Sequence, residues 1–335
     1  MKKIKIHVIA EDFVGEANGV TTAILELIQS LEKDSFYELV DDPKQADLIH
    51  AHTIGLKYIR QSYKFKQKMI VSAHVVPDSF IGSLIFSKLW QPLAKQYLKY
   101  VYNRSKEVIA VSPFVKLELE KIGVTSKIHV LCNSVDRQKF KQNSDLRKKI
   151  RDKHGLTNEF VATCVGQIQP RKGIYDFIET AKQCPDITFV WVGGTPFKSL
   201  TADYKKLQEV VKDAPKNIIF TGIIDFNDMP AYYAMSDVYF MPSFQENFAF
   251  ATIEASSVKL PLVLRDNVEY PSSLFTHYLK GKTASDFATI IQQLKTDQDY
   301  FSKWQMESEN LASQYSLKAY NKTLKNIYLG LLDNS

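Results

Sequence analysis

Short apolar runs alternate with amphipathic stretches along the first third of the chain. The runs end in polar residues, as buried parallel strands do at their carboxyl ends, and they lie at 4–12, 46–53, 69–74 and 108–114. Between the first two runs, the stretch from Thr21 to Leu31 carries apolar residues at the spacing of a helix. Strands that alternate with helices form parallel sheets, so this part of the chain is predicted to be an α/β unit.

The same alternation restarts after a charged stretch with few apolar residues, Asp136 to His154. The strands predicted beyond it lie at 160–168, 187–194, 217–224 and 238–243. Two such series separated by a polar segment predict an α/β protein with two Rossmann-like domains. We place the first domain at 1–137, a linker at 138–157, the second domain at 158–312, and a helix that returns to the first domain at 313–335.

The composition fits a folded protein of this size. The 335 residues are 45% hydrophobic and 24% charged, which excludes a disordered or fibrous chain. No apolar run reaches the roughly 20 residues that span a bilayer. The start of the chain reads as a strand and not as a signal peptide, so we expect a cytoplasmic protein. The cysteines have neither disulfide nor metal-ligand spacing and are expected to be core thiols: Cys132, Cys164 and Cys184.

Positive charge is concentrated in one segment. The net charge is only +6, yet residues 54–106 contain ten basic residues and a single acid, Asp78. An anionic partner is therefore expected. A helix through 81–106 would carry lysines on one side, Lys88, Lys95, Lys99 and Lys106, and apolar residues on the other, Phe86, Leu89, Trp90, Leu93, Ala94, Tyr97, Tyr100 and Val101.

Such a segment suits an anionic membrane surface, which attracts basic residues by about 1 kcal/mol each. Aromatic residues suit the interface of a membrane. The alternative is an ordinary helix whose apolar side faces the core and whose lysines are solvated. No nucleic-acid motif accompanies the basic residues, so we expect no nucleic acid as a partner. The residues predicted to meet the membrane are Lys57, Arg60, Lys64, Lys66, Lys68, Lys88, Lys95 and Lys99.

Two glutamates follow the predicted strand at 238–243. Glu246 lies in the loop after the strand, and Glu254 comes eight residues later, inside a helix that begins near Ala251. A loop carboxylate can bind sugar hydroxyls, and a carboxylate near a helix start can accept both hydroxyls of a ribose. The alternative is two unrelated surface acids. The strand, the loop and the small-residue helix around them favour a ligand site.

A second candidate site lies in residues 166–173, between the first strand and the first helix of the second predicted domain. Arg171 offers a fork of donors and Lys172 a point charge, and both suit a diphosphate. Without a metal, such charges would offset the negative charge that develops on a leaving diphosphate. The alternative is a basic helix start exposed to solvent.

The first predicted domain offers further candidates. Residues 15–19 follow the first strand with a glycine at each end, which permits close approach of a ligand to the backbone, although an ordinary turn explains them as well. His74 ends the strand at 69–74, at the edge where ligands bind in this architecture. A histidine bonded within its own loop is the alternative. His50 and His52 end another strand, and a metal pair there is a further alternative.

The Glu246 and Glu254 pair resembles the Glu-x7-Glu signature of the retaining GT-B glycosyltransferases, and this resemblance covers nearly the whole chain. It implies two Rossmann-like domains that face each other across a cleft, a nucleotide sugar as donor, and no metal or other cofactor. It also implies that Glu246 and His74 contact the donor sugar and that Glu254 contacts the ribose. The catalytic set is then His74, Glu246, Arg171 and Lys172, with predicted donor contacts also from Gly19, Gln167, Asn247, Phe248, Ala249 and Glu254.

Two positions depart from the pattern of this family. Gln167 stands where the family has an arginine, and Arg171 is a candidate substitute from the neighbouring turn. Residues 248–251 replace a glycine-rich stretch, so the donor-sugar contacts expected there differ from those of the family.

Several stretches together resemble the bacterial diglycosyldiacylglycerol synthases, namely 74–79, 166–177, 190–194 and 242–246. This resemblance implies transfer of a hexose, glucose from UDP-glucose, onto monoglucosyldiacylglycerol at the inner face of the cell membrane. The α-configuration would be retained by same-face attack, with the leaving phosphate helping to take the acceptor proton. The alternatives are a cytosolic GT-B transferase of capsule or cell-wall polysaccharide synthesis, a nucleotide-sugar epimerase, and a non-enzymatic binding module.

Overall fold

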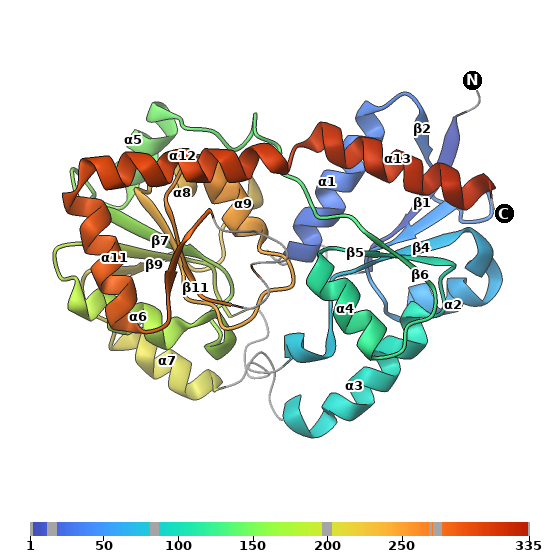
Figure 1. Ribbon diagram of the computed structural model, residues 1–335, viewed down its shortest axis with the longest axis horizontal. Helices are drawn as coiled ribbons and strands as arrows, with labels where there is room; N and C mark the ends of the chain where they lie inside the picture. The colour runs from blue at the N-terminus through green and yellow to red at the C-terminus, as the bar shows by residue number, and fades with distance from the viewer. Residues whose placement is uncertain are drawn as a thin grey trace. The chain divides into compact units, whose positions relative to one another are not determined.

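The computed structural model describes residues 3–11, 19–80, 87–195, 203–267, 270 and 277–333, without the side chains of residues 80, 87 and 88. The chain divides into two compact units (Figure 1). Unit 1 comprises Met1–Phe80, Lys88–Asn133 and Leu317–Ser335, and unit 2 comprises Ile81–Ser87 and Ser134–Ser316. Each unit has its own sheet.

The sheet of unit 1 is built, in the described residues, from β1 (Ile4–Ile9), β2 (Tyr37–Leu39), β3 (Leu48–Ala51), β4 (Met69–Ala73), β5 (Glu107–Ala110) and β6 (Lys127–Val130). All neighbouring strands are parallel, in the order β2-β1-β3-β4-β5-β6. Every residue of β3, β4 and β5 is buried. Strands buried on both faces are typical of a parallel sheet that helices cover on both sides.

The helices of unit 1 are α1 (Gly19–Lys33), α2 (Leu56–Phe65), α3 (Ser87–Tyr102), α4 (Pro113–Lys121) and α13 (Leu317–Asp333). The last of them, red in Figure 1, comes from the far end of the chain and completes the core of this unit. Leu324 and Tyr328 of α13 share one hydrophobic cluster with Ile6 of β1 and Leu27 of α1. The predicted C-terminal helix therefore packs into the N-terminal unit.

The sheet of unit 2 is built, in the described residues, from β7 (Val161–Val165), β8 (Thr188–Val192), β9 (Ile218–Phe220), β10 (Val238–Met241), β11 (Leu262–Arg265) and β12 (Leu279–Gly281). These strands are also parallel, in the order β12-β11-β10-β7-β8-β9. Two parallel sheets with helices around them confirm the predicted α/β class. The carboxyl ends of β7 and β10 lie beside each other, because these strands are neighbours.

The helices of unit 2 are α5 (Ser144–Lys153), α6 (Ile174–Gln183), α7 (Tyr204–Lys212), α8 (Met229–Met235), α9 (Phe250–Ser257), α11 (Ala284–Thr296) and α12 (Gln298–Gln314). Large aromatic side chains join α6 to the sheet. The ring centroid of Phe177 lies 5.0 Å from that of Trp191 on β8 and 5.6 Å from that of Phe240 on β10. All three are fully buried, so close packing holds the strands whose ends carry the candidate site.

The segment predicted as a linker, 138–157, contains helix α5, which belongs to unit 2. Arg147 donates to the backbone carbonyls of residues 234–236 at the end of α8, and to Asp237 at 2.7 Å. Arg151 is buried and also donates to a carbonyl at the end of α8. The segment is charged because its arginines bind carbonyls that a helix end leaves unpaired, and sequence patterning alone does not distinguish this from a solvated linker.

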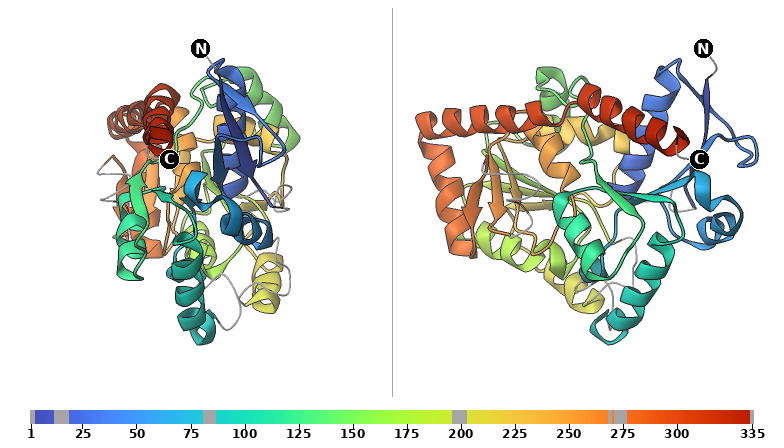
Figure 2. Two further views of the ribbon diagram at one scale, coloured as in Figure 1. Left: turned by 90° about the vertical axis from the view of Figure 1, so that its right-hand side faces the viewer. Right: turned by 45° about the vertical axis from the view of Figure 1, so that its right-hand side comes forward.

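The basic segment differs from the single helix predicted through 81–106. Residues 81–86 lie outside the described part of the chain, and α3 ends at Tyr102, so Lys106 is not on the helix. Helix α3 lies at the margin of unit 1 (Figure 2). Only a narrow stripe of it is buried, and several residues of its predicted apolar side are exposed, against the alternative that this side faces the core: Leu89, Leu93, Tyr97 and Tyr100.

Candidate active site

The candidate donor residues of unit 2 gather where β7 and β10 end. The turn that carries Arg171 and Lys172 follows β7, and the loop that carries Glu246 follows β10. Gly173 closes the turn with φ +79°, and a Cβ atom at this position would lie 2.2 Å from the carbonyl oxygen of Pro242. Only glycine fits this position. The close packing of the two loops brings Lys172 to Glu246.

Lys172 and Glu246 form a buried ion pair. The Nζ atom of Lys172 lies 2.6 Å from Oε1 and 2.9 Å from Oε2 of Glu246, which is only 7% exposed. Burial acts to raise the pKa of Glu246, but the charges of Lys172 and Arg171 outweigh it and hold this pKa below its ordinary value. Burial also lowers the pKa of Lys172, against the attraction of Glu246. The glutamate is thus a carboxylate at neutral pH with an ammonium beside it.

Arg171 supports the loop that carries Glu246. Its Nη1 atom donates to the backbone carbonyl of Gln245 at 2.6 Å and to the side-chain oxygen of Gln245 at 3.0 Å. The amide of Gln245 donates in turn to Asn247 at 2.7 Å. Gln167 accepts a hydrogen bond from Gln169 at 2.8 Å. These bonds hold the backbone on both sides of Glu246, and diphosphate contacts from Arg171 and Gln167 stay predictions.

Glu254 differs from Glu246 in its surroundings. It lies in α9, is 4% exposed, and accepts a hydrogen bond of 2.6 Å from the hydroxyl of Tyr233 on α8. Burial raises the pKa of Glu254 to about 7, although the bond from Tyr233 and the charge of Lys139 oppose the rise. Glu254 therefore changes its charge near neutral pH, whereas Glu246 stays ionised.

Phe248 and Ala249, which lie between Glu246 and the start of α9, are part of the packing. Ala249 is buried, and its carbonyl accepts from the backbone nitrogen of Thr252 at 3.0 Å. The ring centroid of Phe248 lies 5.4 Å from that of Phe250 and 5.8 Å from that of Tyr315. Larger side chains therefore fill the space that a glycine-rich stretch would leave, and donor contacts from Phe248 and Ala249 stay predictions.

One arginine that the sequence analysis did not single out organises this edge of the sheet. Arg265 ends β11, is 8% exposed, and donates to the carbonyls of Pro242 at 2.9 Å and Lys282 at 2.6 Å. It also pairs with Asp176 in the first turn of α6, and its guanidinium carbon lies 3.8 Å from the ring centroid of Phe244. A charge at the end of the apolar strand LVLR was the only signal for this role.

Three histidines of unit 1 lie side by side near the ends of β3 and β4. The ring centroids of His50 and His52 are 4.5 Å apart, and those of His52 and His74 are 5.1 Å apart. The Nδ1 atom of His52 lies 3.0 Å from Nε2 of His74. Burial lowers the pKa of His74 to about 4, and burial together with the charge of His74 lowers that of His50 to about 3. The stack is therefore neutral at physiological pH.

His50 anchors this stack to the rest of unit 1. Its Nδ1 atom lies 2.6 Å from the hydroxyl of Tyr328 on α13, and its Nε2 atom lies 2.8 Å from the hydroxyl of Ser72 on β4. Gly19, predicted as a donor contact, is the first residue of α1 and is exposed. The other residues of the predicted glycine loop, 15–18, lie outside the described residues.

The sequence of this chain matches two glycosyltransferase families. Residues 147–311 match the family described as glycosyl transferases group 1, and residues 33–139 match glycosyltransferase family 4. The chain is 30% identical over 325 residues to the alpha-galactosylglucosyldiacylglycerol synthase of Streptococcus pneumoniae, which covers 94% of this chain and 86% of that protein. The chain belongs to the group 1 glycosyltransferases. A second relative of this glycosyltransferase is the processive diacylglycerol alpha-glucosyltransferase of Acholeplasma laidlawii, 30% identical over 285 residues and 83% of each chain.

Solved structures show the same fold as this glycosyltransferase. Anabaena HepE in complex with UDP-glucose matches with a TM-score of 0.77 at 18% identity, over 98% of this chain and all of that one. The sucrose-phosphate synthase of Thermosynechococcus elongatus matches with a TM-score of 0.77 at 16% identity, over the full length of both chains. Both likenesses confirm the predicted GT-B fold.

The basic segment of the glycosyltransferase forms an exposed surface on α2 and α3, which we call the basic aromatic face. Leu56 and Tyr63 of α2 are 84% and 65% exposed, and Leu89 and Leu93 of α3 are 79% and 74% exposed. The hydroxyls of Tyr63 and Tyr100 lie 2.7 Å apart, which joins the two helices. The basic residues exposed with them are Lys57, Arg60, Lys64, Lys66, Lys95 and Lys99.

Two of the lysines predicted to meet a membrane stand apart from this face. Lys68 is half-buried, and its ammonium donates to the carbonyls of Pro43 at 2.9 Å and Ala46 at 2.6 Å. The assignment of Lys68 to the membrane surface is therefore corrected, because its charge holds a loop of unit 1. The side chain of Lys88 lies outside the described residues.

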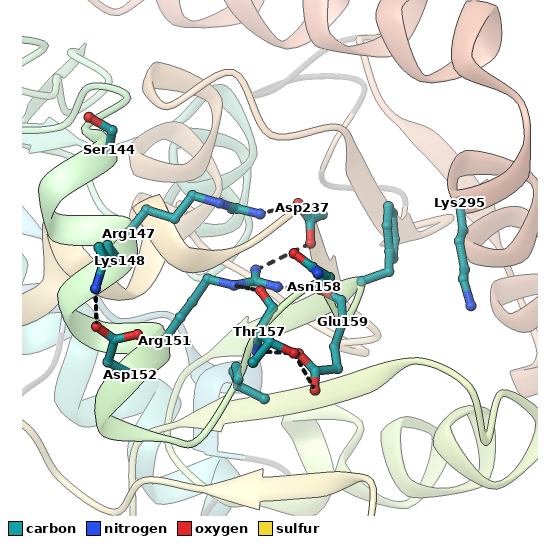
Figure 3. A pocket seen from close by; sticks show the side chains of 12 residues that line it. Ser144, Arg147, Lys148, Arg151, Asp152, Thr157, Asn158, Glu159, Asp237 and Lys295 are labelled. Atoms are coloured by element: carbon teal, nitrogen blue, oxygen red, sulfur yellow. Dashed lines mark hydrogen bonds and ion pairs between the residues drawn. The ribbon is translucent and has the colours of Figure 1, made fainter.

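Unit 2 of the glycosyltransferase contains a cavity of about 660 Å³ at the amino ends of β7 and β10, the edge opposite Lys172 and Glu246 (Figure 3). Its cations are already engaged. Lys148 pairs with Asp152 at 2.7 Å, Lys295 pairs with Asp186, and Arg147 and Arg151 bind the end of α8. The described basic residues that line this cavity therefore stabilise the fold, and none of them is an unpaired cation that could bind a phosphate.

No helix among the described residues is long and apolar enough to cross a membrane. The cysteines are free thiols, of which Cys164 and Cys184 are buried, as predicted, and Cys132 is half-buried. The part of the chain that the structure describes contains no group of three or more histidine, cysteine, aspartate or glutamate side chains that could hold a metal ion.

Proposed function

We propose that this glycosyltransferase transfers a glucosyl group from UDP-glucose onto monoglucosyldiacylglycerol, with retention of the α-configuration, at a membrane surface. The observation that carries the proposal is the buried Lys172–Glu246 pair at the carboxyl ends of β7 and β10. The Lys172 ammonium has three N–H donors, of which the two oxygens of Glu246 occupy two. Among the described residues this ammonium has no third hydrogen-bond partner, so one donor is left for a diphosphate.

The donor site is proposed from the chemistry of unit 2. Lys172 would stabilise the negative charge of the departing diphosphate, Glu246 would accept hydroxyls of the sugar, and Glu254 would accept hydroxyls of the ribose. The complex of HepE with UDP-glucose, in a chain of the same fold, supports a nucleotide sugar as the donor.

The proposed reaction exchanges one bond at the anomeric carbon of the sugar. The bond from this carbon to the diphosphate oxygen breaks, with the electron pair leaving on UDP. A bond forms from the same face to the acceptor oxygen, and the acceptor proton passes to the leaving phosphate. Lys172 and Glu246 act by orientation and charge, so the step needs no oxidant and no metal.

The lipid acceptor is proposed from two relatives and one surface. The names of the Streptococcus and Acholeplasma enzymes specify diacylglycerol glycolipids. The basic aromatic face offers exposed leucines and tyrosines beside lysines, a combination that suits the headgroup region of an anionic bilayer. In this arrangement α2 and α3 would hold unit 1 at the membrane where the acceptor resides.

The proposal is tested by incubating the protein with UDP-glucose and monoglucosyldiacylglycerol in anionic micelles, with UDP-galactose in a parallel reaction. Mass spectrometry of the lipid is expected to show a dihexosyl product with UDP-glucose, and NMR of its anomeric proton is expected to show an α-linkage. A product from UDP-galactose alone would refute the donor, and a β-linkage would refute retention.

Matched variants connect the product to the site. Glu246→Gln and Lys172→Met are each expected to lower the rate of formation of the dihexosyl lipid by about 10²- to 10³-fold. Lys148→Met, which removes an exposed lysine of the same unit, is expected to leave this rate unchanged. Hydrolysis of UDP-glucose without any lipid product would refute the acceptor and keep the transferase chemistry. Conversion of the donor to another nucleotide sugar without an acceptor would indicate an epimerase.

A further inference from the structure

The contact between His52 and His74 has room for one proton. The His52 Nδ1 and His74 Nε2 atoms are 3.0 Å apart, so one nitrogen must donate and the other must accept. Two bare nitrogens would repel each other, and two N–H groups would clash. The tautomer of His74 is therefore tied to the tautomer of His52.

The second ring nitrogen of His52, Nε2, indicates which of the two histidines donates the proton. His52 is 4% exposed, and its Nε2 atom is buried without a hydrogen-bond partner among the described residues. If His74 donated to His52, the proton of His52 would sit on Nε2 as a buried N–H without an acceptor. If His52 donates from Nδ1, Nε2 is only a bare acceptor. Buried N–H groups without partners are rarer in proteins than acceptors without partners.

We propose that His52 is a positioning residue that donates from Nδ1 and so holds His74 as the tautomer protonated on Nδ1. This inference rests on the proposed function and on the contact between His74 and the donor sugar that the family resemblance implies. The proton of His74 is then on Nδ1, and a ring N–H can donate to a hydroxyl oxygen of a sugar. Imidazole in water prefers the opposite tautomer, so the protein must impose this one.

His52 is the middle member of the buried stack. Its ring lies between those of His50 and His74, and His50 is held at both nitrogens by Tyr328 and Ser72. Burial, with the charges of the two neighbouring histidines, keeps the pKa of His52 well below its ordinary value. His52 therefore stays neutral, with a single proton on its ring.

The first test reads the tautomers directly and needs no substrate. The seven histidines are labelled with ¹⁵N, and the couplings between ring nitrogens and ring carbon-bound protons identify the protonated nitrogen of each. In the unaltered protein His74 is expected to carry its proton on Nδ1, and in His52→Phe it is expected to shift towards Nε2. A proton on Nε2 of His74 in the unaltered protein, or an unchanged tautomer in His52→Phe, overturns the inference.

The second test asks whether His52 acts through His74. His52→Phe keeps an aromatic ring in the stack and is expected to lower kcat/KM for UDP-glucose about 10- to 100-fold, with unchanged affinity for UDP, which has no sugar. His52→Asn, whose amide can donate from the place of Nδ1, is expected to recover most of the loss. The double variant His52→Phe/His74→Ala is expected to be no worse than His74→Ala, because residues that act as a unit are not additive.

A matched variant separates this role from stability. Tyr328→Phe removes a buried hydrogen bond of the same stack but leaves the contact between His52 and His74. It is expected to change kcat/KM less than twofold even where it lowers the melting temperature as much as His52→Phe. Equal losses in the two variants, or additive losses in the double variant, would overturn the inference. A protein that transfers no sugar refutes the proposed function instead, and the tautomer of His74 is still read by NMR.

Discussion

Each unit carries polar groups at the carboxyl edge of its own parallel sheet, but the groups differ in kind. Unit 2 presents ions, with the Lys172 ammonium 2.6 Å from the Glu246 carboxylate. Unit 1 presents a neutral stack, in which burial lowers the pKa of His74 to about 4. An ammonium can oppose the charge of a diphosphate, and a neutral imidazole can donate to or accept from a hydroxyl. The same type of sheet therefore carries charged groups at its strand ends in one unit and neutral groups in the other.

The largest effect is expected where the ions of unit 2 are removed. Lys172→Met and Glu246→Gln are each expected to lower kcat/KM for UDP-glucose by about 10²- to 10³-fold, because the charge that opposes the diphosphate or orients the sugar is lost. Lys172→Met also leaves a buried carboxylate unpaired, which costs about 3–5 kcal/mol of the free energy of unfolding.

Urea unfolding of the double variant Lys172→Met/Glu246→Gln tests this account of the ion pair. The double variant is expected to regain much of the stability that Lys172→Met loses while staying inactive. A double variant as unstable as the single one would show that the pair is not the source of the loss.

The next largest effect is expected from Arg265, which binds the backbone beside the Lys172 and Glu246 ion pair. Arg265→Met removes the donor to the carbonyls of Pro242 and Lys282 and the partner of Asp176. We expect a loss of about 3 kcal/mol in the free energy of unfolding and a lower kcat, because the loop that carries Glu246 loses its anchor. Calorimetry and steady-state kinetics measure the two. Unaltered kinetics in a destabilised variant would limit Arg265 to the fold.

A pH titration sharpens the contrast between the two glutamates. Glu254 has its pKa raised by burial to about 7, so the folded protein binds more protons than the unfolded chain below that pH. The stability that this group contributes is present at acidic pH and is lost as the pH rises through 7. Ribose hydroxyls favour the ionised form, so affinity for UDP-glucose is expected to fall about tenfold for each pH unit below 7.

Calorimetric titration with UDP-glucose checks this pH dependence, since the diphosphate of the sugar nucleotide does not change its charge in this range. Glu254→Gln is the matched control and is expected to bind weakly at every pH. A pH dependence that persists in Glu254→Gln would assign the proton to another group.

The smallest effects are expected on the basic aromatic face. Lys95→Gln and Lys99→Gln are each expected to weaken binding to vesicles of phosphatidylglycerol about fivefold, since each surface lysine contributes about 1 kcal/mol. Lys205→Gln, an exposed lysine in unit 2, is the control. Co-sedimentation at rising salt measures the effect. Equal binding to vesicles of phosphatidylcholine would contradict an electrostatic attachment.

The fold class and the places of Lys172 and Glu246 after two strands were predictable because both depend on local order in the chain, whereas the ion pair between these residues, 74 positions apart, was not. Strand and helix periods are local, and a polar residue directly after a buried strand marks the site edge. The partners of Glu254 and Arg265 were not predictable in this way. Tyr233 lies on a different helix from Glu254, and Asp176 lies 89 positions from Arg265, so only the assembled sheet brings them together.

Two other segments show where pattern is ambiguous. The charges of α5 read as a solvated linker, because spacing does not reveal that Arg147 binds the end of α8. The apolar side of α3 suits a membrane interface, as predicted, or a protein core, the alternative, and Leu89 and Leu93 are exposed. An amphipathic pattern states that one side avoids water and does not state whether protein or lipid covers it.

The contact between Gly173 and the carbonyl of Pro242 also sets an order in which parts of unit 2 can fold during synthesis of the chain. The turn that presents Lys172 has its packing surface in a loop that the ribosome adds 69 residues later. A nascent chain that ends after β7 and α6 has the basic turn but nothing to shape it. The contact that shapes this turn can therefore form only after β10 has joined the sheet, and a chain truncated before that point would carry the turn without this contact.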